Sequence, residues 1–449
     1  MPPIWTPDQA GQGSQAMRSA QQSGSSEADP VVFKPRAVRR AATAGALGNL
    51  IEYYDFSLYG YLAVVIAPQF FPAGNSTTSL LAALAVFATA FLARPVGGIF
   101  FGLLGDRMGR RTALISSVVC MGVAASATGL LPTYDQIGIA AAVLLFLARL
   151  AQGFSAGGEA VGSITYVYES VPAKRRAFLG SFNYIGSNLG FAVAAVAAGA
   201  VSALTTESQM SDWGWRLPFL LAIPLTFLSL WARLRIEDTP EFAAASRRAD
   251  LPTAPMREAF ATHRAAMART LGVTVAQTGC LFFGLTYMNI YLSANLGYDA
   301  TQVHWLSALV VLTGAVLMLP AGWLAGRLGS RNVLLVGFLG LLLTTYPALM
   351  LMGQDSLALA GAAYLLYMAW GALIQAPAGS LFPHLFERRV RYTGMAVGYN
   401  LGNIVAGGTA PYAAAYLIDR TGDVLSPSFF VMTVCVIGIA TLLGIRNHR

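Results

Sequence analysis

Two acidic residues lie within the first long apolar segment of the sequence, where hydrocarbon would surround them. Glu52 and Asp55 belong to the run Gly48-Asn-Leu-Ile-Glu-Tyr-Tyr-Asp-Phe56. If this segment is a helix, both acids share one stripe with Tyr59. A charge at the middle of a bilayer costs about 2.5–3.5 kcal/mol, so this stripe should face a bundle interior or a wet cavity. The two acids are therefore candidates for proton binding; the alternative is a structural ion pair that locks helices together.

Charged residues in two later apolar segments could pair with these acids. We count a rise of about 1.5 Å per helical residue from the loops. This places Glu52, Arg94 and Glu159 at similar depth from the inner face, and Asp55 and Arg149 at similar depth from the outer face. We therefore expect an upper Asp55–Arg149 pair and a lower cluster of Arg94 with Glu52 and Glu159.

Three acids facing two arginines would leave one carboxylate without a dedicated partner, and that carboxylate should hold a proton most easily. A substrate carboxylate that occupies an arginine's bidentate fork would free Asp55, or alternatively Glu52, to bind a proton. Solute and proton would then travel together. The predicted proton-coupling residues are Asp55, Glu52, Arg149 and Glu159. For Arg94, the alternative to substrate binding is a structural anchor.

Neutral polar side chains in the later apolar segments could complete a binding site. They could donate hydrogen bonds to a hydroxyl or carboxyl group, although polar residues also join transmembrane helices to one another. The predicted substrate-binding residues are Arg94, Arg149, Tyr59, Gln152, Gln277, Tyr287, Tyr291, Gln375, Tyr399 and Asn403.

The composition identifies a membrane protein with many spans. Of 449 residues, 55% are hydrophobic and 11% are charged, against roughly 25% charged in an average soluble protein. The net charge of +8 does not indicate nucleic-acid binding, because the positive residues are not clustered on one face. Cys120, Cys280 and Cys435 are too far apart in sequence for a metal or redox motif. We expect no metal, no cofactor and no enzymatic constellation.

Twelve apolar runs are long enough to cross a bilayer, at about 20 residues each. They lie at 42–67, 79–103, 112–131, 138–168, 178–203, 216–233, 270–293, 303–325, 332–352, 357–382, 394–418 and 427–445. The predicted parts are a disordered tail at 1–40, a six-helix bundle at 41–233, a cytoplasmic linker at 234–269 and a second bundle at 270–449.

Lys and Arg residues predict the orientation. They cluster in the tail and in alternate loops, whereas the opposite loops hold only Arg216 and Arg420. This asymmetry follows the positive-inside rule. It predicts a multi-pass protein of the cytoplasmic (inner) membrane, with both termini in the cytoplasm and no signal peptide at the start.

An internal repeat supports two related halves. Gly102-Leu-Leu-Gly-Asp-Arg-Met-Gly-Arg-Arg111 follows the second apolar run, and Gly322-Trp-Leu-Ala-Gly-Arg-Leu-Gly-Ser-Arg331 follows the eighth. Six-helix halves around a central cavity are typical of carriers that rock about a midplane site.

Several motifs resemble those of the major facilitator superfamily and its metabolite:proton symporter branch. They are the loop 102–111, Gly48 to Phe56, Arg94-Pro-Val-Gly-Gly98, Arg149 to Glu159, Trp213-Gly-Trp-Arg-Leu-Pro-Phe219 and Glu237-Asp-Thr-Pro-Glu-Phe242. The resemblance implies an all-α membrane protein, with twelve transmembrane helices in two pseudo-symmetric six-helix bundles. It also implies proton coupling through an acid of the first helix and an arginine of the fourth.

The resemblance also implies a gate. Asp106, Arg107, Arg110 and Arg111 in the signature loop would clasp the inner ends of the halves. The alternative is a solvated basic loop that only obeys the orientation rule.

Within this branch, Phe70-Phe-Pro-Ala-Gly-Asn75 and Thr421-Gly-Asp423 look most like carriers of citrate and 2-oxoglutarate. The chain stops at Arg449, without the long extension of the osmosensing betaine and proline carriers, which argues against that role. We expect a monomeric, proton-driven importer of a small organic anion in the lipid bilayer. The alternatives are an exporter, an uptake carrier for shikimate or betaine and proline, or a receptor.

Overall fold

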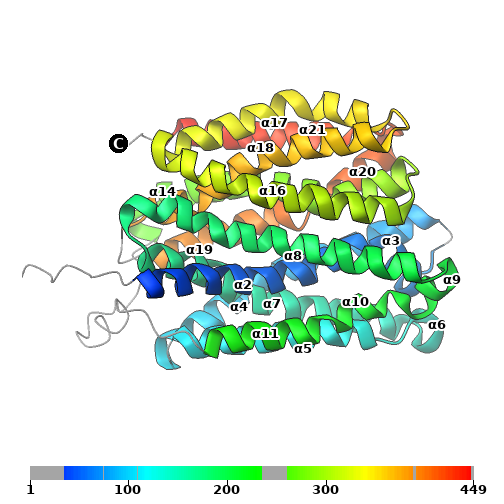
Figure 1. Cartoon of the computed structure of the whole chain (residues 1–449). Coiled ribbons are helices and arrows are strands. Elements are labelled where there is room, and N and C mark those ends of the chain that lie inside the picture. Colours follow the sequence, from blue (N-terminus) through cyan, green and yellow to red (C-terminus); the bar gives the residue numbers. More distant parts are fainter. Residues whose placement is uncertain (1–34, 74, 109, 235–259, 388–390, 446–449) are drawn as a thin grey trace, which may run out of the picture. The chain divides into compact units, whose positions relative to one another are not determined.

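The described chain is helical throughout. The computed structural model describes residues 35–73, 75–108, 110–234, 260–387 and 391–445, and these contain no strand (Figure 1). Contacts among the helices define one compact unit, Arg36–Arg449. Within this part of the chain, the observed secondary structure agrees with the predicted all-α class.

The first half comprises the helices that precede residue 235. Its long helices follow the predicted apolar runs, with short helical turns between them. They are α2 (Pro35–Tyr61), α3 (Ala63–Phe70), α4 (Ser76–Met108), α5 (Arg110–Leu130), α6 (Tyr134–Ile137), α7 (Ile139–Ser170), η1 (Ala173–Arg175), α8 (Arg176–Leu204), α9 (Glu207–Gln209), η2 (Met210–Gly214), α10 (Arg216–Leu220) and α11 (Ala222–Leu234).

The second half comprises the helices that follow residue 259. Three of its segments, η3, η4 and η5, are π-helical. In chain order the elements are α14 (Arg264–Phe282), η3 (Phe283–Tyr287), α15 (Met288–Ile290), η4 (Tyr291–Asn295), α16 (Ala300–Leu328), α17 (Ser330–Met352), α18 (Leu357–His384), α19 (Arg391–Gly402), η5 (Asn403–Gly407), α20 (Ala410–Thr421) and α21 (Pro427–Leu443).

The helices account for the predicted membrane spans. In the described residues, nine stretches are long and apolar enough to cross a membrane, and α2 with α3 forms a tenth that is bent by 68°. The eleventh run is interrupted by the π segment between α19 and α20. The twelfth, α21, has 17 residues, at the lower limit for a span. The arrangement is consistent with twelve spans.

Glycines bring α4 and α7 close together. A Cβ atom on Gly153 would overlap the backbone carbonyl of Ala90, and one on Gly157 would overlap that of Arg94. Small residues at such crossings let membrane helices approach backbone to backbone. The contact holds Arg94 on α4 in register with Arg149, which lies one turn before Gly153 on α7.

The two halves meet along two lines of contact. Helix α8 lies alongside α16 (Figure 1) and also contacts α18. Helix α4 packs against α19, η5 and α20. The predicted linker 234–269 falls mostly on residues 235–259, which lie outside the described residues, as does most of the predicted tail 1–40. The limits proposed for both segments stay predictions.

Candidate functional site

Glu52 of α2 and Arg94 of α4 form a fully buried ion pair. Arg94 Nη2 lies 2.9 Å from Glu52 Oε1, and neither side chain is exposed. The guanidinium carbon is 4.7 Å from the ring centroid of Phe56 and 4.6 Å from that of Phe91. Beyond the ion pair, none of the three guanidinium nitrogens makes a hydrogen bond within the described chain. Aromatic faces therefore support a cation that retains unused donors.

Asp55 and Arg149 form a second buried pair, bridged by Gln152. Arg149 Nη1 lies 3.7 Å from Asp55 Oδ2. Gln152 Nε2 donates to Asp55 Oδ1 at 2.9 Å, and Arg149 Nη1 donates to Gln152 Oε1. The Arg149 guanidinium also lies 4.0 Å from the ring centroid of Tyr59. The structure thus brings together the residues of the predicted upper pair.

Tyr59 and Gln152 use their polar groups inside the protein. The Tyr59 hydroxyl donates to the backbone oxygen of Ala83 at 2.9 Å, while Gln152 links Asp55 to Arg149. Both side chains are fully buried. They support Arg149 here, and a direct contact of either with substrate stays a prediction.

Glu159 lies against Gly48, one turn before Glu52 on α2, but it does not pair with Arg94 as predicted. Its carboxylate pairs instead with the guanidinium of Arg233 on α11 and accepts a hydrogen bond from Ser117 at 3.2 Å. Arg233 also donates to the backbone oxygen of Leu114 at 3.1 Å. Each of the three acids therefore has its own arginine, and the prediction of one unpartnered carboxylate was wrong. Arg233 was overlooked because a basic residue at a helix end also satisfies the orientation rule.

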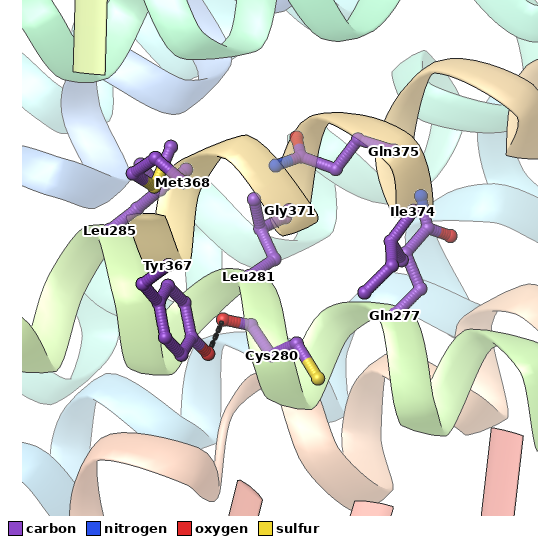
Figure 2. Close-up of a pocket in the computed structure, with 9 residues that line it drawn as sticks. All are labelled: Gln277, Cys280, Leu281, Leu285, Tyr367, Met368, Gly371, Ile374 and Gln375. Carbon is purple, nitrogen blue, oxygen red and sulfur yellow. Dashed lines mark hydrogen bonds between the residues drawn. The ribbon is translucent and has the colours of Figure 1, made fainter. Parts of the chain in front are cut away.

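A small pocket lies between α14 and α18 in the second half (Figure 2). Figure 2 shows Gln277 approaching it from α14 and Gln375 from α18, while Tyr367 donates to the backbone oxygen of Cys280 at 2.8 Å. Both amide atoms of Gln277 and the Gln375 oxygen are buried without a hydrogen-bond partner. Such groups cost about 1–3 kcal/mol each when they stay unpaired. The lining of the pocket consists of Gln277, Cys280, Leu281, Leu285, Tyr367, Met368, Gly371, Ile374 and Gln375.

Three predicted binding residues fall in the three π segments of the second half. Tyr287 ends η3, Tyr291 begins η4 and Asn403 begins η5. The Tyr291 hydroxyl and the Asn403 side-chain oxygen are buried without a hydrogen-bond partner in the described chain. Single π turns are frequent at functional sites. Ordinary helical periodicity gave no sign of these segments.

Tyr399 lies on α19, which packs against α4, the helix that carries Arg94. Its side chain is buried. The amide nitrogen of Asn403 donates to the Tyr399 backbone oxygen at 2.9 Å. The eleventh span therefore lies beside the helix of Arg94 at the boundary between the halves, and a direct contact of Tyr399 or Asn403 with substrate stays a prediction.

The structure also brings together two cysteines that the sequence separates. The sulfur atoms of Cys280 on α14 and Cys435 on α21 are 3.7 Å apart, and both side chains are buried. Their distance in sequence suggested no relation between them. Only the packing of α14 against α21 reveals it.

The predicted gate falls where α4 ends and α5 begins. Helix α4 includes positions 106 and 107, and α5 begins at Arg110. The side chains of Asp106, Arg107, Arg110 and Arg111 lie outside the described residues. The clasp stays a prediction.

Comparison with known families identifies transporter models over both halves. Residues 41–256 match the model described as Sugar (and other) transporter, and residues 274–448 match the Major Facilitator Superfamily model. The fold resembles a crystal structure of a D-xylose-proton symporter, with a TM-score of 0.70 and 18% identity over 91% of this chain and 97% of that one. It also resembles a partially occluded inward-open xylose transporter from E. coli, with a TM-score of 0.72 and 17% identity over the same shares.

Several relatives are similar over nearly the whole chain. The proline/betaine transporter of Escherichia coli K12 is 34% identical over 92% of this chain and 84% of its own length. The glycine betaine/proline/ectoine/pipecolic acid transporter of Dickeya dadantii is 34% identical over 93% and 85%. A putative proline/betaine transporter of Staphylococcus aureus is 34% identical over 90% and 87%.

These relatives correct the expected substrate. The motif resemblance to citrate and 2-oxoglutarate carriers, and the argument from the chain end against a betaine or proline role, were wrong guides. The relatives do not support transport of an organic anion. The family matches do support the prediction that the protein is a transporter and not an enzyme. The chain is a multi-pass membrane protein of the major facilitator superfamily and belongs to the same family as these proline/betaine transporters.

Proposed function

We propose that the protein is a proton-coupled carrier of a small zwitterion of the proline and betaine class, working by alternating access. The names of the relatives support this substrate class. In the structure, the observation that carries the proposal is the buried Glu52–Arg94 pair, whose guanidinium retains unused donors. Helix α4, which carries Arg94, packs against α19 of the second half, and this suits a site that both halves share.

A zwitterion matches this pair in charge. Its carboxylate can occupy the Arg94 fork, since guanidinium and carboxylate form paired hydrogen bonds. Its ammonium end then lies towards Glu52. Each buried charge keeps a partner of opposite sign, and the net charge of the site does not change. An organic anion would instead add an uncompensated negative charge in a buried environment, which is costly.

The Asp55–Arg149 pair supplies the proton step in this proposal. At 3.7 Å the ion pair is looser than Glu52–Arg94, and Asp55 Oδ2 makes no hydrogen bond within the described chain. When the conformational change moves Asp55 of α2 away from Arg149, the buried carboxylate without a partner takes up a proton, because an unpaired charge there costs several kcal/mol. Glu159 stays paired with Arg233 throughout and carries no proton.

The proposal keeps the predicted gate and the predicted orientation of the protein in the membrane. Asp106, Arg107, Arg110 and Arg111 close the inner side, and both termini face the cytoplasm of the inner membrane. Uptake is the direction proposed, because it is the one that an inward proton gradient drives.

Uptake into proteoliposomes tests the function. Purified protein would be reconstituted and given radiolabelled proline, glycine betaine, citrate or 2-oxoglutarate, with and without an inside-alkaline pH gradient. We expect the two zwitterions to accumulate only with the gradient and the two anions not to enter. Saturable binding without accumulation would identify a receptor and refute the proposal.

A further inference from the structure

Three buried aromatic rings meet where the two halves touch. They are Tyr53 of α2, Phe191 of α8 and Phe282, the last residue of α14, and we call them the aromatic cluster. The ring centroids of Tyr53 and Phe191 are 5.8 Å apart, and the Phe282 centroid is 6.4 Å from each of the other two. All three side chains are buried. The first half contributes two rings and the second half contributes one.

The cluster differs from the neighbouring rings in what covers its π faces. Arg94 lies over Phe56 and Phe91, and Arg149 lies over Tyr59 and more distantly over Phe87. Within the described chain, no arginine or lysine lies over a ring of the cluster. The rings of Tyr53 and Phe282 stack on each other, so their π faces become available to a cation from outside the protein when the rings separate.

We propose that Tyr53, Phe191 and Phe282 bind the methylated ammonium group of the substrate by cation–π contacts. This inference rests on the proposed function and deepens it. Tyr53 follows Glu52 in the chain, and Phe282 of the cluster contacts Phe91, whose ring face Arg94 covers. A zwitterion whose carboxylate lies on Arg94 therefore directs its cationic end towards the cluster.

The spacing of the three rings limits the size of the group that fits between them. A point equidistant from the three centroids lies about 3.6 Å from each, within the roughly 6 Å over which a ring attracts a cation. The methyl groups of a trimethylammonium ion contact ring carbons at about 3.5–4 Å, and its nitrogen lies farther from the ring than they do. The group therefore needs more space than the present separation of the three rings leaves. The rings fill this space themselves in the present arrangement. They must separate as the second half tilts and carries Phe282 away from Tyr53 and Phe191.

The chain around Phe282 suits this movement. Phe282 is followed at once by the π segment η3, which begins at Phe283. Phe282 also contacts Phe91, with ring centroids 5.2 Å apart, and Phe91 carries Arg94 on its face. Displacement of Phe282 therefore exposes the aromatic surface next to the arginine that holds the carboxylate.

Fluorinated phenylalanine at position 282 tests the contact with little change of shape. Fluorine withdraws charge from the ring face, so three fluorines should raise the half-saturation concentration for glycine betaine about ten- to thirtyfold, with intermediate values for one and two. The carbon isostere 3,3-dimethylbutyrate lacks the positive charge and so has a net negative charge; it should inhibit only weakly, and this inhibition should not change along the series. The same series at Phe191 should give the same result.

The control is Phe219 on α10, which is equally buried but packs against Trp215. Fluorination there should leave both ligands unaffected, and size-exclusion chromatography verifies that each variant is folded. If betaine affinity stays constant along the series at position 282, or if the isostere loses affinity equally, the aromatic cluster is not the cation site, while proline and betaine transport stands. If the unmodified protein accumulates neither zwitterion, both proposals are overturned.

Discussion

Replacing Asp55 by asparagine should separate transport from the proton gradient. The Asp55 carboxylate is 1% exposed, lies 3.7 Å from Arg149 Nη1 and accepts a hydrogen bond from Gln152 at 2.9 Å. An amide of the same shape can still accept from Gln152, but it cannot gain or lose a proton. The variant should therefore bind substrate and exchange it, yet be unable to use the gradient.

The size of the effect follows from the coupling. One proton carried per zwitterion down a gradient of one pH unit supplies about 1.4 kcal/mol, which corresponds to a tenfold accumulation. The unmodified protein should reach roughly this ratio of internal to external glycine betaine. Asp55→Asn should stop at a ratio of about one, because nothing then drives the substrate uphill.

Proteoliposomes with an inside-alkaline gradient measure both quantities. Counterflow, in which preloaded unlabelled substrate draws in labelled substrate, shows that the variant is folded and still alternates. Asp419→Asn is the matched control, because Asp419 is exposed near the end of α20 and belongs to no described ion pair. An accumulation of about tenfold by Asp55→Asn would refute the assignment of the proton step to Asp55.

Three further changes test other parts of the site. Arg94→Lys keeps the charge but loses the planar fork, so the half-saturation concentration for proline and betaine should rise at least tenfold in uptake assays. Glu159→Gln leaves Arg233 buried without its partner and should cost about 3–5 kcal/mol of stability. Thermal unfolding in detergent should show this loss, and the double variant with Arg233→Met should recover most of it. Gly153→Val forces α7 away from α4, so folded yield should fall sharply, whereas Gly326→Ala, where a Cβ meets open space, should fold normally.

The sequence predicted the spans and the charged pairs for simple physical reasons. Span length is dictated by bilayer thickness, so apolar runs mark the helices with little ambiguity. The regular rise of a helix placed Asp55 level with Arg149 and Glu52 level with Arg94. Depth alone says nothing of direction around the helix axis, which is why Glu159 was assigned to the wrong arginine.

Other features depended on tertiary packing or on the substrate itself. The π segments at Phe283–Tyr287 and Asn403–Gly407 leave no trace in hydrophobic periodicity. The contact between Cys280 and Cys435 arises only when α14 packs on α21. The substrate class was mistaken because two short motifs and the position of the chain end were used as guides, whereas similarity over nearly the whole chain is to proline/betaine transporters.

The glycine contact between α4 and α7 has a mechanical consequence. Two helices that touch backbone to backbone cannot slide or roll independently without steric collision. Helices α4 and α7 therefore move together as one rigid unit. The spacing between the backbone positions of Arg94 and Arg149 stays constant while the carrier changes conformation. Motion that changes what each arginine holds must come from the partner surfaces, which concentrates the moving joints in the first helix and in the π turns of the second half.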